Sequence, residues 1–258
     1  MKKIFTLILT VIMAVACCLG LTACGEEETT LADGKLTIGY TIYAPMNYFD
    51  ENNDNKFVGF DTELAEAFCK IIGVEADFVE IEWDNKFTDL KSKNIDCIWN
   101  GMTITEEAKE KCAVSAAYLE NKQVVVCKAE NASKYTDINS LSNAASIAYE
   151  KGSAGNSVAT DLGLDSKGVE VTAQKDALME VASGASEIAL IDITMARVLT
   201  GEGTSYENLV FVDVGCEVEE FGVAFRKADE GLAKAFDIFV ATCQMTGEYD
   251  MLMAKYFA

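Results

Sequence analysis

The chain has 258 residues, half of them apolar, and carries a formal net charge of −21 without a single histidine. This acidic balance argues against a protein that binds nucleic acid or anionic lipid through a basic surface. The lack of histidine excludes Ser-His-Asp and Cys-His catalysis and any histidine-ligated metal, and we expect no catalytic residues, no metal and no cofactor.

The first part of the chain has the pattern of a lipoprotein signal peptide. Two lysines precede an apolar run, residues 4–19, which is short for a membrane span. The tetrad Leu-Thr-Ala-Cys, which ends at Cys24, resembles a bacterial lipobox. We therefore predict that residues 1–23 are removed and that Cys24 is lipidated, with a plain cleaved signal as the alternative. Residues 24–34 lack apolar periodicity and are interpreted as a tether that anchors the protein to the membrane without spanning it.

From Lys35 onward, short apolar runs alternate with segments of helical periodicity. This alternation predicts an α/β protein with parallel sheets and helices on both faces, and its length suits two small domains. Gly73 and Gly247 are placed to end helices. The predicted strands are 35–40, 74–81, 95–98, 123–127, 146–149, 168–172, 188–192, 209–213 and 221–225. The predicted helices are 62–72, 138–144, 153–162, 175–183, 193–200 and two within 230–257.

The stretch 81–107 carries the most information about function. An alternating apolar run predicts that Trp83 ends a half-buried strand. Later, small polar residues at 100–105 are predicted to form a loop that leads into a helix capped by Thr105. Backbone N–H groups and hydroxyls gathered at a helix start favour a small polar or anionic ligand, while an ordinary capped connection is the alternative.

Nine cysteines are present, of which two lie in the predicted leader and one is the predicted lipid site. The other six lack CxxC spacing, and buried free thiols are the preferred interpretation. Whether any of them form disulfides is left open, because six cysteines allow 15 connectivities. The six are Cys69, Cys97, Cys112, Cys127, Cys216 and Cys243.

A series of motifs follows in order along the chain: GFDTELAEAFCKIIGVE from Gly59, NGMTITEE at 100–107, EKGS at 150–153, ALID at 189–192 and EYDMLMAKYF at 248–257. Together they resemble the family 3 extracellular solute-binding proteins, which deliver polar amino acids to ABC importers. The resemblance covers essentially everything from about Leu36 onward. It implies a two-lobed, periplasmic-binding-protein-like fold of type II, in which the lobes clamp a ligand between them.

The resemblance also implies how the chain is divided. Two crossing segments are expected near residues 119–122 and 214–219. The first lobe then comprises residues 35–119 plus 217–258, and the second lobe residues 120–216. A cleft at the carboxyl ends of the strands fits the general rule for open α/β sheets, and closing of the lobes is a hinge motion.

In the first lobe, the resemblance assigns two aromatic residues and a polar corner to the ligand. Tyr43 and Trp83 are expected to sandwich the ligand's side chain through stacking or a cation–π contact. Asn100, Gly101 and Thr103 are expected to contact the ligand through backbone and hydroxyl groups. Without the resemblance, each aromatic residue would be interpreted as part of the core or the rim.

In the second lobe, the resemblance places Ser153 and the N–H of Ala154 at a carboxylate-binding helix start. Asp192 is expected to hold the ligand's α-ammonium, with a helix N-cap as its other possible role. One departure stands out, because the family has an arginine that grips the α-carboxylate where this chain has Ala108. The neighbouring Lys109 is turned away by about 100° on a helix. The identity of the ligand is therefore left open.

These implications lead to one prediction and two alternatives. We predict a lipid-anchored protein on the extracytoplasmic face of the cell membrane that captures a small polar solute, above all an amino acid, for an ABC transporter permease. A sensor of the same fold is the first alternative. An enzyme of the dehydratase or transglycosylase kind is the second, but carboxylates such as Asp192 and Glu150 are more commonly binding groups, so we expect no enzyme. No nucleic-acid partner is expected.

Overall fold

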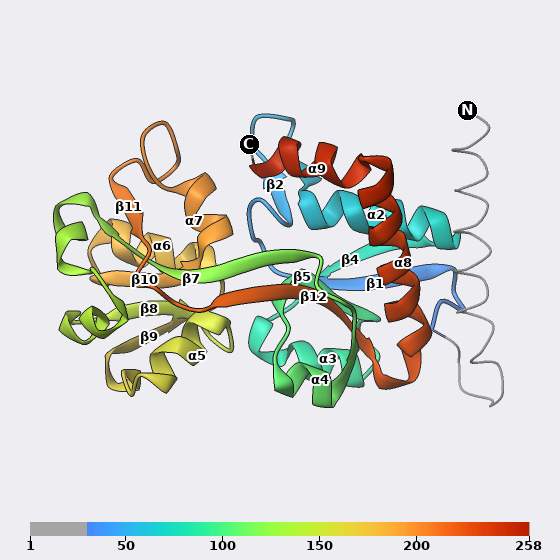
Figure 1. Cartoon of the computed structure of the whole chain (residues 1–258), viewed down its shortest axis with the longest axis horizontal. Coiled ribbons are helices and arrows are strands. Elements are labelled where there is room, and N and C mark those ends of the chain that lie inside the picture. The colour runs from blue at the N-terminus through green and yellow to red at the C-terminus, as the bar shows by residue number, and fades with distance from the viewer. Residues whose placement is uncertain (1–29, 258) are drawn as a thin grey trace.

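A computed structural model describes residues 30–257 of the chain, so the predicted signal peptide and Cys24 lie outside the described part. Figure 1 shows two lobes side by side, connected by the long strands β7 (Leu119–Lys128) and β12 (Val218–Arg226). These two strands pair in antiparallel register, from Leu119 opposite Phe221 to Lys122 opposite Val218. The strands of both lobes therefore join in one continuous order, β4-β1-β5-β12-β7-β10-β8-β9.

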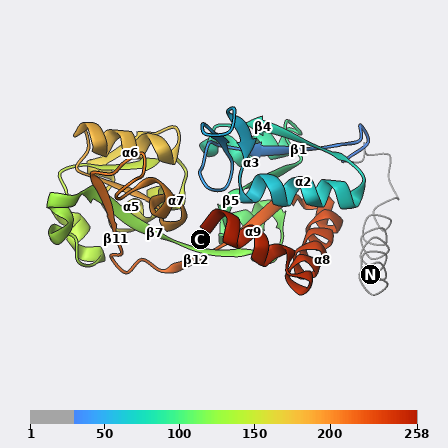
Figure 2. The same ribbon diagram turned by 90° about the horizontal axis from the view of Figure 1, so that it is seen from above.

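The first lobe is built on three parallel strands, with β1 between β4 and β5, and β12 runs antiparallel beside β5. Helices cover both faces of this sheet (Figure 2). Its strands are β1 (Lys35–Tyr40), β2 (Tyr48–Asp50), β3 (Lys56–Val58), β4 (Glu75–Glu80), β5 (Cys97–Thr103) and β6 (Cys112–Val114). Its helices are α2 (Phe60–Ile72), α3 (Lys86–Lys91), α4 (Glu106–Lys111), α8 (Glu230–Thr246) and α9 (Glu248–Phe257).

Strand β5 shows why the central strands are continuously apolar. Successive side chains of a strand point to opposite faces, and both faces of this sheet are covered. Trp99 packs into the cluster formed with α2 and α8, where its ring lies 4.8 Å from that of Phe236. Its neighbour Ile98 packs on the other face with Leu90 and Ala108 of α3 and α4. Truncating a fully buried aromatic residue such as Trp99 to alanine would cost about 3–5 kcal/mol of stability.

The second lobe repeats this plan with β10, β8 and β9 in parallel and β7 antiparallel to β10. Strand β11 pairs with the other edge of β7. The strands are β8 (Ile147–Glu150), β9 (Gly168–Val171), β10 (Ile188–Asp192) and β11 (Leu209–Val212), and the helices are α5 (Ala154–Asp161), α6 (Gln174–Ser183) and α7 (Ile193–Leu199).

The two-lobed α/β fold is confirmed, but three predictions about strands were wrong. The sheet is mixed, because β7 and β12 run against their neighbours. Residues 100–103 belong to β5 instead of a loop, since Met102 and Thr103 pair with Gly222 and Phe221 of β12. Trp83 begins a 3₁₀ turn, because the preceding strand ends at Glu80.

Helix α2 follows its sequence signals at both ends. Gly59 precedes it with a φ of 145°, and a Cβ there would lie 2.0 Å from the carbonyl oxygen of Met46, so only glycine fits. The helix ends at Gly73 in the left-handed conformation, which confirms the predicted stop. The segment predicted as helix 138–144 is instead a 3₁₀ helix, Ile138–Asn143, that Asp137 caps.

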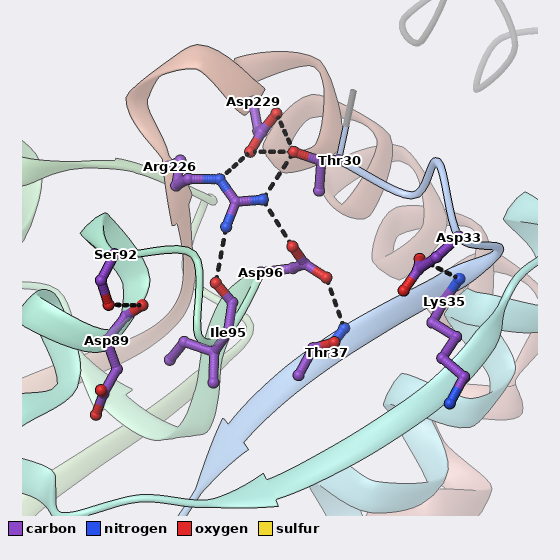
Figure 3. Close-up of polar contacts among 10 residues, drawn as sticks. All are labelled: Thr30, Asp33, Lys35, Thr37, Asp89, Ser92, Ile95, Asp96, Arg226 and Asp229. Carbon is purple, nitrogen blue, oxygen red and sulfur yellow. Dashed lines mark hydrogen bonds and ion pairs between the residues drawn. The ribbon is translucent and has the colours of Figure 1, made fainter. Parts of the chain in front are cut away.

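The beginning of the described chain is held by an ionic cluster in the first lobe (Figure 3). The Arg226 guanidinium is 2.7 Å from Asp96 and 3.1 Å from Asp229, and it also donates to the Ile95 carbonyl oxygen. The Thr30 hydroxyl donates to Asp229 and accepts from Arg226. The cluster therefore determines where the polypeptide enters the lobe.

Two further findings concern cysteines and the membrane. Cys69, Cys97, Cys112, Cys127, Cys216 and Cys243 are all buried with free thiols. Burial raises the pKa of the Cys69 and Cys243 thiols to about 12, which keeps them protonated and unreactive. Within residues 30–257, no helix combines the length and the apolar character needed to cross a bilayer.

Candidate functional site

A cavity of about 80 Å³ lies between the lobes, where strands of both lobes end. Its size suits a small molecule, and its lining is polar with an aromatic side. All eight residues predicted to bind a ligand line this one cavity: Tyr43, Trp83, Asn100, Gly101, Thr103, Ser153, Ala154 and Asp192. The structure thus brings together residues that are up to 149 positions apart in the sequence.

The lobes touch around the cavity. The Lys86 ammonium of the first lobe donates to the carbonyl oxygen of Gly152 at 2.9 Å. Lys151 lies 3.4 Å from the Asp84 carboxylate, and the Tyr43 hydroxyl forms a hydrogen bond with Thr194. Gly152 has a φ of 70°, and a Cβ there would lie 2.9 Å from an Asp84 oxygen. The close approach of the lobes at this point therefore requires glycine.

Asp192 ends β10 and is 3% exposed, with both carboxylate oxygens inside the protein. Its Oδ1 accepts from the amides of Asn121 at 2.5 Å and Gln123 at 2.6 Å, and its Oδ2 accepts from Gln174 at 2.5 Å. Burial raises the pKa of Asp192, and the amide hydrogen bonds oppose this by stabilising the anion. Asp192 also occupies the N-cap position of α7, as the alternative role predicted, but its side chain makes no capping bond to that helix.

A second carboxylate belongs to the same amide network. Glu219, on β12, accepts at 3.3 Å from both Asn121 and Gln123, and at 3.0 Å from the Thr103 hydroxyl. Burial, and then the negative charge of Asp192, raise the pKa of Glu219 to about 7. The Thr103 hydroxyl hydrogen, predicted to face the ligand, is thus donated within the protein.

The Asn100 side chain is likewise committed to its own lobe. Its oxygen accepts from the backbone and hydroxyl of Thr41, and its nitrogen donates to the Thr41 carbonyl oxygen and to Asn47. These bonds hold the middle of β5 against the residue that follows β1. Only the backbone of Asn100 is left for a ligand.

Gly101 leaves space beside the cavity because it has no side chain. It has a φ of 58°, and a Cβ would lie 2.9 Å from the Tyr43 ring and 3.0 Å from Phe221. Its N–H, predicted to contact the ligand, donates to the buried Asp61 carboxylate at 2.8 Å. Tyr118 donates to the same oxygen at 2.9 Å. The Gly101 N–H is therefore already donated within the first lobe, and the close contact with Tyr43 and Phe221 requires the absence of a side chain.

The helix start predicted in the second lobe is present. Ser153 is the N-cap of α5, and its hydroxyl oxygen accepts from the Asn156 N–H at 3.2 Å. The first N–H groups of a helix, here beginning with that of Ala154, have no acceptor within the helix. They carry the positive end of the helix dipole to the wall of the cavity.

Glu150 and Lys86 are charged residues of the cavity that were missed or left unassigned. Glu150 is 2% exposed, and within residues 30–257 its Oε1 has no hydrogen-bond partner. Burial and the charge of Asp192 raise its pKa well above the usual range, while Lys86 opposes them. Lys86 is 9% exposed, and its ammonium lies 4.8 Å from the centre of the Trp83 ring. The one sequence signal for Lys86 is its position three residues after Trp83, where a helix would place both on one face.

The other residues that line the cavity are Phe87, Met102, Thr105, Glu107, Gly152, Ser157 and Gln174. Ala108 is not among them, because it is buried in the core of the first lobe. In the described part of the chain, no group of histidine, cysteine or acidic residues is arranged to hold a metal ion.

The model of the bacterial extracellular solute-binding proteins, family 3, matches residues 36–258. The arginine-binding extracellular protein of Bacillus subtilis is 28% identical over 95% of this chain and 96% of its own length. The L-cystine-binding protein of Escherichia coli is 27% identical, over 95% and 93% respectively.

Solved structures are similar over nearly the same length. A substrate-binding protein of an ABC uptake transporter from Streptococcus pneumoniae, with bound histidine, has a TM-score of 0.79 at 26% identity, over 88% of this chain and 94% of that one. An ancestral amino acid-binding protein, a precursor of cyclohexadienyl dehydratase, has a TM-score of 0.78 at 29% identity, over 88% and 97%.

Proposed function

The chain belongs to the bacterial extracellular solute-binding proteins of family 3, and we propose that it captures an amino acid outside the cell and delivers it to an ABC importer. The observation that carries the proposal is Asp192, a buried carboxylate in a cavity whose other wall contains a helix start. A carboxylate attracts an ammonium group, and a helix N-terminus attracts a carboxylate. An amino acid presents both groups on one carbon atom.

The rest of the cavity supports this proposal. Tyr43, Trp83 and Phe87 supply an apolar, aromatic side for the ligand's side chain. Relatives named for arginine and for cystine indicate that members of the family differ in the side chain of the amino acid that they bind. The lobes meet around the cavity through Lys86–Gly152 and Tyr43–Thr194, so closed lobes would shield the ligand from water.

For location, we propose a lipid on Cys24 after removal of residues 1–23, with residues 24–34 as tether. The lipobox-like tetrad supports this. The protein would then stay at the outer face of the cell membrane, close to its permease. We also keep the predicted division into residues 35–119 plus 217–258 and 120–216, with the hinge in the strands that connect the two lobes.

An enzyme of this fold is the second candidate, since one structural neighbour is named as a precursor of a dehydratase. Glu150 and Asp192 are the carboxylates that such a reaction would use. Both are placed as well for binding a cation, and the relatives named above are binding proteins. A sensor of the same fold would use the same cavity.

The test is a binding screen of the purified protein, residues 24–258, against the twenty amino acids by calorimetry, with mass spectrometry of any molecule that co-purifies. We expect one or a few amino acids to bind and to be recovered chemically unchanged. Lack of binding to all twenty would reject the proposal. Conversion of a bound molecule to a product would favour the enzyme instead.

A further inference from the structure

Lys86 is an unusual lysine, because its charged end lies inside the protein. It is the first residue of α3, and a lysine on a surface helix ordinarily keeps its ammonium in water. Here the residue is 9% exposed and lines the cavity between the lobes. Burial lowers its pKa, because desolvation disfavours the charged form. Burying an ammonium destabilises the protein unless the charge has partners. The groups around the Lys86 ammonium therefore indicate its role.

The partners in the protein do not satisfy this ammonium. It donates to the carbonyl oxygens of Gly152 at 2.9 Å and Trp83 at 3.2 Å. It also lies 4.8 Å from the centre of the Trp83 ring and 5.1 Å from that of Phe87. An ammonium has three N–H donors, so one is left. Throughout residues 30–257, no carboxylate lies within ion-pair distance of it, and the charges of Glu150, Glu107 and Asp84 act on it only from further away.

The position of this ammonium is defined by its bond to Gly152. Gly152 immediately precedes Ser153, the N-cap of α5, so the ammonium lies beside the helix start. The N–H groups at this start and the Lys86 ammonium are two sources of positive potential that meet at one wall of the cavity. Two such groups from different lobes form a site for an anion.

Lys86 is also the one basic residue among those that line the cavity. The sequence contains two arginines, and both are elsewhere. Arg226 is bound to Asp96 and Asp229 in the first lobe, away from the cavity (Figure 3). Arg197 is exposed on α7. No arginine is therefore placed to bind a carboxylate here.

We propose that Lys86 pairs with the carboxylate of the bound amino acid, together with the first N–H groups of α5, while Asp192 binds its ammonium. This inference rests on the proposed function and adds the residue that selects for a free carboxylate. It also gives the carboxylate a cation that Ala108 cannot supply. Because Lys86 comes from the first lobe and α5 from the second, a carboxylate between them connects the lobes directly.

The test compares Lys86→Met and Lys86→Arg with wild type. The probes are the amino acid that wild type binds most tightly among the twenty and the α-amide of that amino acid, which lacks the negative charge. The matched control is Lys35→Met, which removes a lysine that pairs with Asp77 within the first lobe, has a side chain that is 42% exposed and does not line the cavity. Thermal unfolding of each variant verifies the fold, and Lys86→Gln replaces Lys86→Met if the latter does not fold.

We expect Lys86→Met to weaken binding of the acid by about 10- to 100-fold, the range for a hydrogen bond to a charged group. Its binding of the amide should change less than about threefold, because no charge pair is lost. Lys86→Arg should keep most of the preference for the acid, and Lys35→Met should behave as wild type. Equal losses for acid and amide, or no loss for either, would overturn the role of Lys86 while leaving amino acid binding intact. A wild type that binds none of the twenty would instead reject the proposed function, and this inference with it.

Discussion

Asp192 and Glu219 share two amide donors although they come from different strands, β10 and β12. The Asn121 amide nitrogen is 2.5 Å from Asp192 and 3.3 Å from Glu219, and the Gln123 nitrogen is 2.6 Å and 3.3 Å from the same two carboxylates. Asn121 lies on β7, where it pairs with β12 between the lobes. The acid expected to hold the ligand's ammonium is therefore connected electrostatically to the strands that link the lobes.

This pair predicts how stability depends on pH. Burial and the Asp192 charge raise the pKa of Glu219 from 4.5 to about 7. Between these values the folded protein binds more protons than the unfolded chain, so the free energy of unfolding falls as pH rises from about 4.5 to about 7. In urea unfolding, the free energy of unfolding of Glu219→Gln should fall by about 1–3 kcal/mol less than that of wild type over this pH range. An identical fall in both proteins would mean that Glu219 is charged throughout this range.

The ammonium site is tested by Asp192→Ala. Removing one partner of a buried charge pair costs roughly 2–5 kcal/mol of binding, so the affinity for an amino acid should fall by about 30-fold or more. Trp83 fluorescence should respond to ligand in wild type and report the loss. Asp213→Asn is the control, because Asp213 pairs with Lys122 outside the cavity. Unchanged affinity in Asp192→Ala would remove this residue from the binding site.

How far the site could be predicted depended on whether the signal was local. The family resemblance assigned Asp192 and Ser153 to the ligand, and each of them also stands at a strand end or a helix start, which a short pattern reveals. The commitment of the Asn100 side chain to its own lobe was not foreseen, because its partners, Thr41 and Asn47, are 59 and 53 positions away. Lys86 was missed for the same reason, since its acceptor on Gly152 is 66 positions further along the chain and in the other lobe.

The fold shows the same division between local and long-range signals. Helix α2 was predicted within two residues, because its apolar spacing and Gly73 lie in one continuous segment. Strand β5 was predicted to stop before Asn100, although it continues to Thr103. Its polar end is a strand only because β12, more than a hundred residues later, supplies the hydrogen-bond partners. Parallel and antiparallel neighbours could not be told apart from hydrophobic runs alone.

The lipid anchor, which is predicted from the sequence alone, is tested by Cys24→Ala. Without the thiol no lipid can be attached, and a single cysteine anchor is the only membrane attachment that we predict. The variant should be released into the soluble fraction or should accumulate unprocessed. Cys18→Ala, within the predicted leader, is the matched control and should stay with the membrane. A correctly cleaved Cys24→Ala protein that sediments with membranes as wild type does would show that the lipobox interpretation is wrong.

The last prediction concerns Glu150, whose Oε1 is buried in the cavity wall without a hydrogen-bond partner among residues 30–257. Burial and the charge of Asp192 raise the pKa of this carboxyl well above the usual range, while Lys86 opposes them, so it keeps its proton to a higher pH than an exposed glutamate does. A ligand with a second positive charge, such as lysine or arginine, would stabilise the anion and release a proton. Calorimetry in buffers of different ionisation enthalpy measures that release directly.

Replacing Glu150 by glutamine keeps the shape of the side chain and removes the charge. Glu150→Gln should therefore abolish proton release and weaken binding of lysine and arginine by about 1–3 kcal/mol relative to glutamine, the range for hydrogen bonds to charged groups. It should also raise the melting temperature slightly, since a carboxyl with a raised pKa has to take up a proton on folding at neutral pH and glutamine does not. The control is Glu170→Gln, because Glu170 lies in the same lobe and contacts Lys151 outside the cavity. If Glu150→Gln changed the affinities for lysine and glutamine equally, Glu150 would not respond to the charge of the ligand's side chain.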